Sequence, residues 1–250
     1  MKLLEGKIAL ITGASKGIGR AIALAMADVG ADIIATARTE EELKELCEEI
    51  RKKGRRAEYI VADLRSTEEA KAMAQRALEI FGRVDILVNN AGVSYPQPAL
   101  ETTEDRWDET FQINLKSLFF LTQVIAKAMV KQGGGKIVNI SSQAGLVGLE
   151  DHAAYCATKG GLILLTKVLA IEWGKYKINV NAVAPTIIMT PMAERAWADP
   201  KKREEALKKI PIGRFGKPED VVGAVIFLAS HYADLITGAV LPIDGGYTAQ

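Results

Sequence analysis

Two side chains four residues apart could exchange a proton with a substrate. Tyr155 and Lys159 occupy positions i and i+4 of a segment with helical periodicity, so their side chains lie on one face of the expected helix. A phenol titrates near about pH 10 unless it is perturbed, and a neighbouring ammonium group favours the phenolate and lowers that pKa. The pair could therefore act as a general acid or base near neutral pH. The alternative is a simple surface pair.

A hydroxyl group is expected to face this pair from a neighbouring strand. An expected strand over residues 136–140 is followed by Ser141 and Ser142, thirteen residues before Tyr155. Open α/β sheets bind ligands beyond the carboxyl ends of their strands. Ser142 therefore presents a hydroxyl group at the edge of the sheet where a ligand is expected to bind.

A glycine-rich turn near the N-terminus could hold a phosphate. Residues 12–19 read Thr-Gly-Ala-Ser-Lys-Gly-Ile-Gly and connect an expected strand to an expected helix. A Cβ atom would block both the tight turn and the approach of a pyrophosphate to the first N–H groups of the helix. The spacing departs from the commoner G-x-G-x-x-G pattern, so a glycine turn without a ligand is the alternative.

The residue after the second expected strand discriminates between cofactors. An acidic residue there would bind a ribose 2′-hydroxyl, whereas Arg38 suits the 2′-phosphate of NADP(H). Lys16 in the glycine turn adds a second cation near the same ribose. We therefore expect NADP(H) as the favoured cofactor and keep NAD(H) as the other candidate. Arg38 could instead only pair with Glu41 or Glu42 of the next helix.

The elements that must position these residues alternate along the chain. We expect strands over residues 7–12, 32–37, 57–61, 84–88, 136–140, 177–183 and 239–243, and helices over residues 17–29, 40–53, 67–81, 103–131, 155–176 and 218–230. Nearly continuous apolar strands separated by helices predict an α/β fold, with a doubly wound parallel sheet of about seven strands and helices on both faces. Thr39 and Glu42 have the spacing of a capping box at one helix start. The irregular stretch 185–217 is expected to form a substrate-binding lid.

Length and composition exclude several classes of protein. The 250 residues fit one domain spanning 1–250, and a net charge of +1 gives no basic footprint for nucleic acid. No continuous apolar run reaches the roughly 18 residues that a membrane span needs. The two cysteines, Cys47 and Cys156, lie far apart, and with two histidines in the whole chain neither a disulfide framework nor a metal site is expected. We expect a soluble cytoplasmic protein without nucleic-acid or membrane partners.

Six motifs in this order resemble the short-chain dehydrogenase/reductase family. They are the glycine turn, Asp63-Leu64, Asn89-Asn90-Ala91-Gly92, Asn114, Tyr155 and Lys159 with Ser142 upstream, and Ile243-Asp244-Gly245-Gly246. The resemblance covers essentially the whole chain. It implies a Rossmann-type fold, a homotetramer and an NAD(P)-dependent oxidoreductase acting on CH–OH or C=O groups.

The resemblance also implies roles for individual residues. Tyr155 would be the general acid/base, Ser142 would hold the substrate oxygen, and Lys159 would lower the pKa of the tyrosine and bind the nicotinamide ribose. Asn114 would anchor a water connecting Lys159 to solvent. The expected cofactor-binding residues are Gly13, Ser15, Lys16, Gly17, Ile18, Gly19, Arg38, Asp63, Leu64, Asn90, Ala91, Gly92, Tyr155, Lys159, Pro185, Ile188 and Thr190.

One departure from the family pattern bears on the substrate. Pro185 is followed by Thr186 where the family usually has Gly, and together with His152 and Trp197 this resembles the branch of L-xylulose/dicarbonyl reductases and sugar-alcohol dehydrogenases. The resemblance implies a substrate pocket formed by Ser142, Gln143, Leu149, His152, Tyr155 and Trp197. Such a pocket suits a small polyhydroxylated ketone. His152 could instead cap its helix, and Trp197 could only pack under the lid.

The expected function is hydride transfer between NADP(H) and a small keto-sugar, polyol or dicarbonyl compound. Within the same chemistry, a 3-oxoacyl-thioester reductase or a gluconate-type sugar-acid dehydrogenase is the alternative. A non-catalytic nucleotide-sensing scaffold is the alternative from another class. One apolar face of the expected helix 103–131 could meet either the sheet or a symmetry mate, namely Leu115, Leu118, Phe119, Thr122 and Ala126.

Overall fold

A parallel sheet runs through the computed structural model, which describes residues 2–190, 193–194 and 197–249. The seven described strands have the order β3-β2-β1-β4-β5-β6-β7, and every neighbouring pair is parallel. Their bounds are β1 Ile8–Thr12, β2 Asp32–Ala37, β3 Ala57–Val61, β4 Ile86–Asn89, β5 Gly135–Ile140, β6 Ile178–Pro185 and β7 Val240–Ile243. The predicted doubly wound sheet is confirmed.

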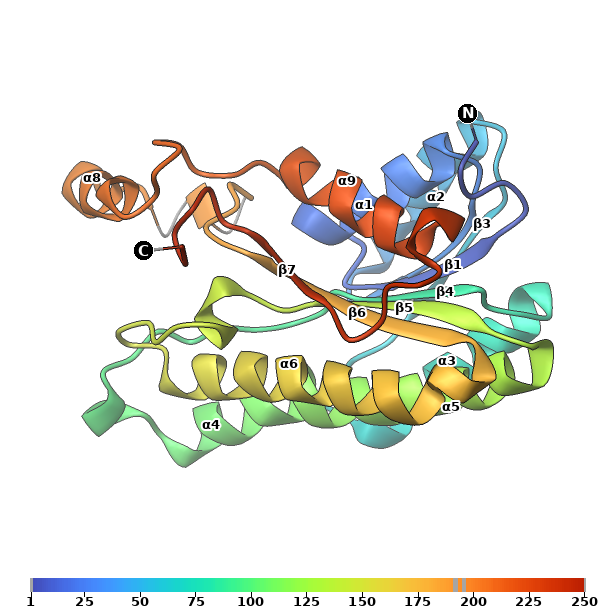
Figure 1. Ribbon diagram of the computed structural model, residues 1–250, viewed down its shortest axis with the longest axis horizontal. Helices are drawn as coiled ribbons and strands as arrows, with labels where there is room; N and C mark the ends of the chain where they lie inside the picture. Colours follow the sequence, from blue (N-terminus) through green and yellow to red (C-terminus); the bar gives the residue numbers. More distant parts are fainter. Residues whose placement is uncertain (1, 191–192, 195–196, 250) are drawn as a thin grey trace.

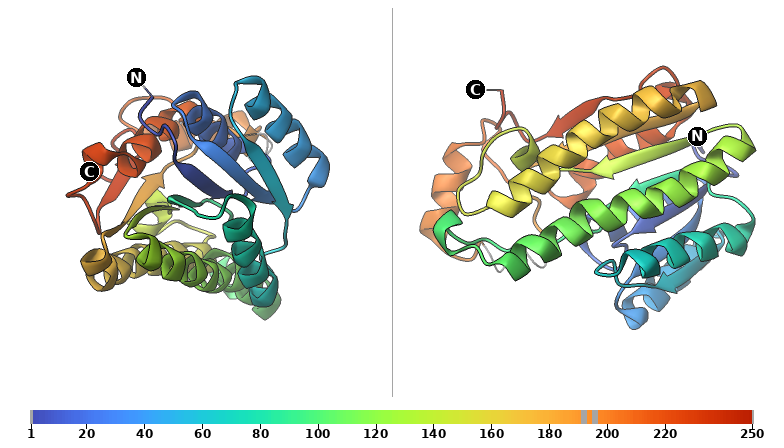
Figure 2. Two further views of the ribbon diagram at one scale, coloured as in Figure 1. Left: turned by 90° about the vertical axis from the view of Figure 1, so that its right-hand side faces the viewer. Right: turned by 90° about the horizontal axis from the view of Figure 1, so that it is seen from below.

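Helices cover both faces of this sheet (Figures 1 and 2). On one face lie α1 Gly17–Asp28, α2 Glu40–Lys52 and α9 Pro218–Ala229. On the other lie α3 Thr67–Phe81, α4 Glu104–Phe111, α5 Leu118–Gln132 and α6 Ala153–Trp173. The strand order reverses between β1 and β4, and a crevice beyond the carboxyl ends of the strands at such a point is where doubly wound sheets bind ligands.

Burial on both faces explains the apolar strands. All five residues of β1 are buried. Alternate residues of this strand serve opposite faces, because Ile11 belongs to the core under α1 and α2, whereas Leu10 belongs to the core under α3 and α5. A strand with two buried faces must be apolar throughout, which is why continuous apolar runs located the sheet correctly.

The long helix predicted over residues 103–131 is interrupted. A π-helical segment, η2 Gln112–Ser117, separates α4 from α5 and contains Asn114. Such π-helical segments occur often at functional sites. The apolar face predicted here is turned mainly into the chain's own core, because Leu118, Thr122 and Ala126 are at most 4% exposed.

Two expectations about helix starts need correction. Thr39 precedes α2 as expected, but its side chain makes no capping hydrogen bond, and the Glu42 side chain is paired with Lys16. The predicted capping box is therefore wrong. The stretch 185–217 was predicted as irregular, yet it contains α8 Pro200–Lys208. Asp199 accepts a hydrogen bond from the Lys201 amide (2.9 Å) and Pro200 occupies the first turn, so ordinary N-terminal signals start this helix.

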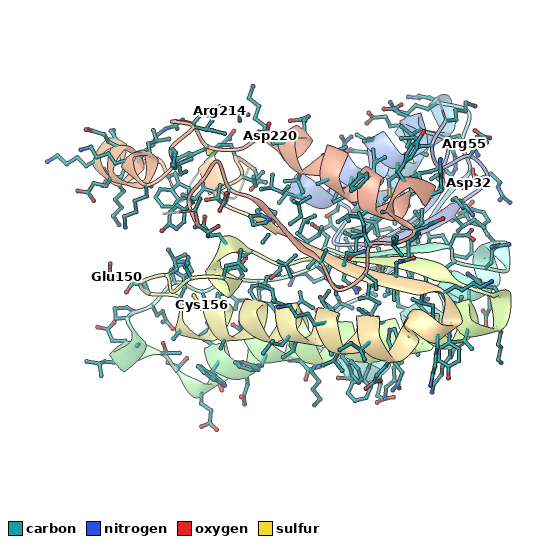
Figure 3. The ribbon with its side chains drawn as sticks, in the orientation of Figure 1. Asp32, Arg55, Glu150, Cys156, Arg214 and Asp220 are labelled. Atoms are coloured by element: carbon teal, nitrogen blue, oxygen red, sulfur yellow. The ribbon has the colours of Figure 1, made fainter. Side chains whose placement is uncertain are left out.

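The stretch 185–217 is fastened at both ends, and residues 191, 192, 195 and 196 lie outside the described part. The Met189 amide donates to the oxygen of Gly216 and the Gly216 amide donates to the oxygen of Ile187. Near the C-terminal end of the stretch, Arg214 binds Asp220 in the first turn of α9 (2.6 and 2.8 Å; Figure 3). This guanidinium, with the Lys217 amide, lowers the pKa of Asp220 to about 2. The predicted lid is thus a loop with a defined base.

Within the described residues, two segments are long and apolar enough to cross a membrane by length and composition, Glu104–Gln132 and Ala153–Tyr176. Neither segment is a continuous apolar run, because polar and charged residues interrupt both. About half of each apolar window is buried inside the protein (50% and 44%), because α5 and α6 pack against the sheet. Core helices of globular proteins pass the same test.

Candidate active site

A cavity of about 410 Å³ lies at the reversal of the strand order. Many of the predicted cofactor residues line it: Gly13, Ser15, Lys16, Gly17, Ile18, Arg38, Asp63, Leu64, Asn90, Ala91, Gly92 and Thr190. The sequence reading missed further lining residues, namely Thr12, Thr36, Ala37, Thr39, Glu42, Ala62, Val93 and Ile113. Most of these flank the strand ends already identified, so their position next to the motifs could have revealed them.

The start of α1 is suited to an anion. Lys16 is the N-cap residue, its side chain makes no capping hydrogen bond, and no acidic residue lies in the first turn. The first N–H groups of α1 and its positive dipole end are therefore available to a pyrophosphate. Gly13 has φ +64°, and a Cβ atom there would lie 2.9 Å from Cα of Ala91. The turn fits a dinucleotide on both counts.

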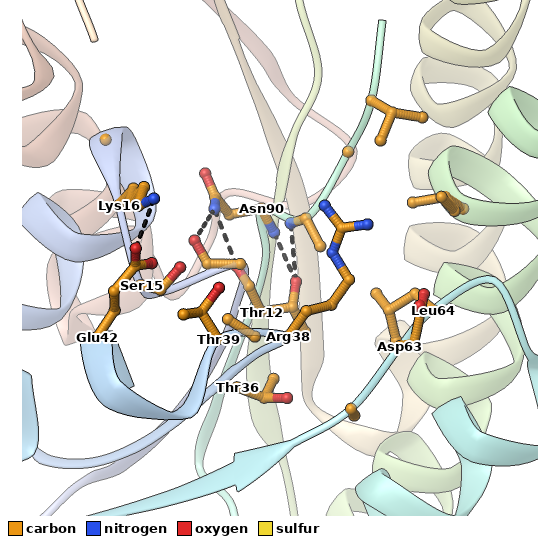
Figure 4. Close-up of a pocket in the computed structure, with 18 of the residues that line it drawn as sticks. Thr12, Ser15, Lys16, Thr36, Arg38, Thr39, Glu42, Asp63, Leu64 and Asn90 are labelled. Carbon is orange, nitrogen blue, oxygen red and sulfur yellow. Dashed lines mark hydrogen bonds and ion pairs between the residues drawn. The ribbon is translucent and has the colours of Figure 1, made fainter. Parts of the chain in front are cut away.

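Gly19 and Asn90 brace this turn. A Cβ atom on Gly19 would lie 2.3 Å from the Gly13 oxygen and 2.5 Å from Nδ2 of Asn90. Nδ2 of Asn90 donates to the main-chain oxygens of Thr12 (2.9 Å) and Gly13 (3.1 Å), as Figure 4 shows. Gly19 lies outside the cavity lining, so its absent side chain allows close packing instead of ligand contact.

The charged residues of the cavity lie on two sides of it. Lys16 Nζ is 2.5 Å from Oε1 of Glu42, whereas the Arg38 side chain extends to the other side, toward Asp63 and Leu64 (Figure 4). The Arg65 guanidinium binds Asp63 (2.8 Å) and is the main cause of the lowered pKa of that carboxyl group. The sequence left open a pairing of Arg38 with Glu41 or Glu42. In the structure Glu42 pairs with Lys16 instead.

The predicted reactive residues meet at the carboxyl end of β5. Ser142 follows this strand, and its Oγ accepts a hydrogen bond from the Ala144 amide (3.2 Å). Burial raises the pKa of Tyr155, and a hydrogen bond with Ser142 opposes part of that rise. The expected lowering of this pKa is wrong for the structure, since burial outweighs the other influences.

Lys159 is buried beneath the tyrosine. Its Nζ donates to the Ile140 oxygen (2.8 Å) and lies 5.6 Å from the centre of the Tyr155 ring. Burial lowers the pKa of Lys159 to about 8. A Cβ atom on Gly92, which lines the cavity, would lie 3.6 Å from this Nζ. The cavity therefore adjoins the Tyr155–Lys159 pair.

Asn114 fastens the loop that carries Gly92. Its Oδ1 accepts from the Val93 amide (2.8 Å), and its Nδ2 donates to the Val93 oxygen (2.9 Å) and to Oγ1 of Thr158 (3.2 Å). The buried amide side chain thus joins η2, the loop after β4 and α6. These bonds hold the loop after β4 against η2 and α6.

Some of the predicted substrate residues lie beside Ser142 and Tyr155, whereas Trp197 lies within the stretch 185–217. Gln143 is buried next to Ser142, and His152 lies 6.1 Å from Tyr155, measured between ring centres. Nδ1 of His152 is bonded to the Glu150 oxygen (2.6 Å), so its side chain does not cap α6. Leu149 is half-buried in the same loop. Trp197 packs against Phe215, 5.5 Å between ring centres, as the packing alternative anticipated.

Three polar side chains in the loops after β4 and β5 have a buried oxygen without a hydrogen-bond partner in the described part of the chain, namely Ser94, Gln97 and Gln143. The main-chain N–H of Gln97 donates to the main-chain oxygen of Asp151 (2.8 Å), and this bond fixes the loop after β4 beside His152. Buried polar atoms are normally satisfied, so these oxygens are candidate acceptors for a bound polar group, although none of the three residues belongs to the cavity lining. The sequence reading missed Ser94 and Gln97, because no motif distinguishes them.

The remaining predicted cofactor residues lie around the loop base. Pro185 ends β6, and Ile188 is buried and pairs with Gly216. Neither belongs to the cavity lining, nor do Tyr155 and Lys159. Within the described residues, no group of three His, Cys, Asp or Glu side chains could hold a metal ion.

Known proteins resemble this chain along its whole length. A family model described as enoyl-(acyl carrier protein) reductase matches residues 13–248. L-xylulose reductase from Bos taurus is 44% identical over 247 residues, 98% of each chain. NAD-dependent glycerol dehydrogenase from Listeria innocua is 41% identical over 99% of this chain and 96% of its own. The crystal structure of a gluconate 5-dehydrogenase from Burkholderia cenocepacia with NADP and tartrate has a TM-score of 0.95 at 35% identity, covering 100% of this chain and 98% of the other.

Proposed function

The chain belongs to the short-chain dehydrogenase/reductase family of oxidoreductases acting on alcohol and carbonyl groups, and from this premise we propose that it reduces small keto-sugars or dicarbonyl compounds with NADP(H), reversibly. The observation that carries this proposal is the placement of Ser142, Tyr155 and Lys159 together beside the cavity at the reversal of the strand order. A bound nicotinamide cofactor would supply or accept the hydride.

Tyr155 is the proposed proton donor in reduction. Its raised pKa keeps the phenol protonated near neutral pH, which is the form that can give a proton to a carbonyl oxygen. Ser142 is the proposed second donor to that oxygen. Negative charge grows on the oxygen as hydride reaches the carbon, so both hydrogen bonds strengthen in the transition state.

Lys159 and Asn114 are proposed to orient the site. Lys159 presents a cation below the Tyr155 ring and beside Gly92, where a nicotinamide ribose would bind. Asn114 holds the loop after β4 through both bonds to Val93. Both protons on Nδ2 are used in the bonds to Val93 and Thr158, so we propose a positioning role for this side chain, and the water-anchoring role that the resemblance implies stays a prediction.

NADP(H) is the cofactor we propose, because Arg38 borders the cavity where an adenosine ribose would lie. NAD(H) is the alternative, and the glycerol dehydrogenase relative is described as NAD-dependent. Titration of both cofactors against wild type and Arg38→Asp tests the assignment. We expect wild type to bind NADPH more tightly and the variant to lose that preference; a wild type that prefers NADH would contradict it.

A polyhydroxylated substrate is proposed from the unpartnered oxygens of Ser94, Gln97 and Gln143. Substrate hydroxyl groups would supply the missing donors, whereas an acyl chain would leave these atoms unsatisfied. The relatives described as L-xylulose reductase and glycerol dehydrogenase support this class. A gluconate-type sugar acid is the second candidate, since a gluconate 5-dehydrogenase has the same fold at 35% identity.

The discriminating experiment is a substrate screen that follows NADPH and NADH absorbance. Pentuloses, hexuloses, diacetyl, sugar acids, polyols and acetoacetyl thioesters are tested with both cofactors. We expect turnover of keto-sugars or diacetyl, and of polyols in reverse. Activity confined to thioesters would contradict the substrate class, and no activity on any class would favour a nucleotide-sensing scaffold.

We also propose a cytoplasmic homotetramer. The face of α6 away from the sheet carries exposed apolar side chains at helical spacing, Leu164, Val168 and Ile171, exposed by 64%, 47% and 82%. Such a stripe is suited to a symmetric helix–helix contact. Light scattering on wild type and Ile171→Glu tests it: we expect a tetramer that the variant dissociates, and a monomeric wild type would contradict it.

A further inference from the structure

Lys16 is already paired inside the proposed cofactor cavity. Its Nζ lies 2.5 Å from Oε1 of Glu42, and the Glu42 side chain is 25% exposed. The other carboxylate oxygen, Oε2, is buried and has no hydrogen-bond partner in the described part of the chain. Both residues line the cavity, on the side opposite the Arg38 guanidinium (Figure 4).

This carboxylate affects the two cofactors in opposite directions. A 2′-phosphate near Lys16 would be repelled by Glu42 and would have to compete with it for the ammonium group. A ribose 2′-hydroxyl could instead donate a hydrogen bond to Oε2, as the acidic residues of NAD-binding sheets do. The partnerless oxygen is therefore an acceptor suited to NAD(H), in a site whose arginine suits NADP(H).

Stabilisation of α2 does not account for the position of Glu42. Glu40 and Glu41 also lie in the first turn of this helix and complement its dipole equally well. Glu42 makes no capping bond with Thr39, as a capping box would require. Its side chain instead pairs with Lys16, which lines the same cavity.

We propose that Glu42 is a specificity-determining residue that limits the preference for NADP(H), both by neutralising Lys16 and by offering an acceptor to a ribose hydroxyl. The inference rests on the proposed function, in that the cavity must hold a nicotinamide dinucleotide. It implies that the chain binds both cofactors, with Arg38 favouring the phosphorylated one and Glu42 opposing that preference.

Equilibrium binding without substrate tests this directly. NADPH and NADH are titrated against wild type, Glu42→Gln and the matched control Glu41→Gln, with nucleotide fluorescence as the readout. We expect Glu42→Gln to tighten NADPH about ten-fold and to weaken NADH, which corresponds to the loss of one opposing charge. Glu41→Gln should change neither Kd by more than about two-fold, because Glu41 lies outside the cavity lining. An equal shift for both nucleotides, or none, would overturn the proposal.

A double-mutant cycle separates Lys16 from Glu42. In wild type Lys16 is occupied by Glu42, so Lys16→Met should weaken NADPH by about two-fold. In the Glu42→Gln background the same change should weaken it about ten-fold. Additive effects would overturn the proposal.

A misfolded variant, a failure of the proposed function and a failure of the Glu42 role can be told apart. Glu42→Ser carries the same expectation, so it replaces Glu42→Gln if thermal unfolding shows that the first variant is misfolded. If wild type binds neither nucleotide, the proposed function fails. If wild type binds both and Glu42→Gln leaves the ratio of their Kd values unchanged, only the role of Glu42 fails.

Discussion

The ammonium group of Lys159 donates a hydrogen bond to the main-chain oxygen of Ile140 across 2.8 Å. Ile140 is the last residue of β5, so this bond joins the helix that carries Tyr155 to the carboxyl end of the sheet. The hydrogen-bond partner of this buried cation is therefore a neutral carbonyl oxygen and not a carboxylate. Such a cation is costly to keep charged, and burial lowers its pKa to about 8.

Replacing Lys159 should stabilise the fold. The ordinary pKa of lysine is 10.5 and the folded value is about 8. Between these two values the unfolded chain binds more protons than the folded one, so the free energy of unfolding of wild type should increase as pH rises through this window. Lys159→Met should be more stable near neutral pH, by on the order of 3 kcal/mol at most, and should lose this pH dependence. Urea unfolding at about pH 7 and about pH 9.5 measures both effects. A variant less stable than wild type at the lower pH would contradict the assignment.

The two directions of reaction should differ in their pH dependence. Reduction needs the protonated Tyr155 and oxidation needs the phenolate, and burial raises the pKa of this phenol. The kcat/KM for alcohol oxidation should therefore keep rising with pH, with no plateau below about pH 9, whereas carbonyl reduction should stay nearly flat up to about pH 8, where Lys159 starts to lose its charge. Initial rates in both directions between about pH 6 and pH 9.5 measure this. A plateau for oxidation near neutral pH would contradict the raised pKa.

Residue types and periodicity predicted the strands and the reactive group well. Strands buried on two faces must be apolar, and Ser142, Tyr155 and Lys159 sit at defined strand and helix ends. What could not be predicted depends on contacts between segments. The Glu42 side chain pairs with Lys16 instead of forming the predicted capping box. The π-helical segment that contains Asn114 has no signature in hydrophobic periodicity. Gln97 is brought beside His152 only because its loop pairs with residues before α6.

Substitution by alanine should weaken nucleotide binding at Gly19 and should stabilise the chain at Gly223. A Cβ atom on Gly19 would lie 2.3 Å from the Gly13 oxygen, whereas one on Gly223 would meet nothing within 4 Å. Gly19→Ala should deform the glycine turn and weaken nucleotide binding by at least about ten-fold. Gly223→Ala, also within a helix, should stabilise the chain by about 0.5–1 kcal/mol. Thermal unfolding and nucleotide titration measure the two effects. Unchanged nucleotide binding in Gly19→Ala would contradict the proposed site.

Gln143 should discriminate between substrates. Its buried Oε1 has no partner in the described part of the chain, so a substrate hydroxyl is the expected donor. Gln143→Leu should raise KM for a keto-sugar about ten-fold and leave KM for diacetyl within about two-fold, since diacetyl has no hydroxyl group to lose. Gln75→Leu on the exposed side of α3 is the control. Equal effects on both substrates would show that Gln143 only supports the loop.

The most direct test of the account is the turnover of Tyr155→Phe. The substitution removes the phenolic proton and leaves the ring beside Lys159 and His152, so nucleotide binding should persist. Steady-state reduction of the best keto-sugar substrate is measured for wild type and variant, with the Kd for NADPH measured on the same preparations. We expect kcat to fall by at least about a thousand-fold while the Kd changes by less than about two-fold. A variant that retains near-wild-type kcat would contradict the role of Tyr155 as the proton donor.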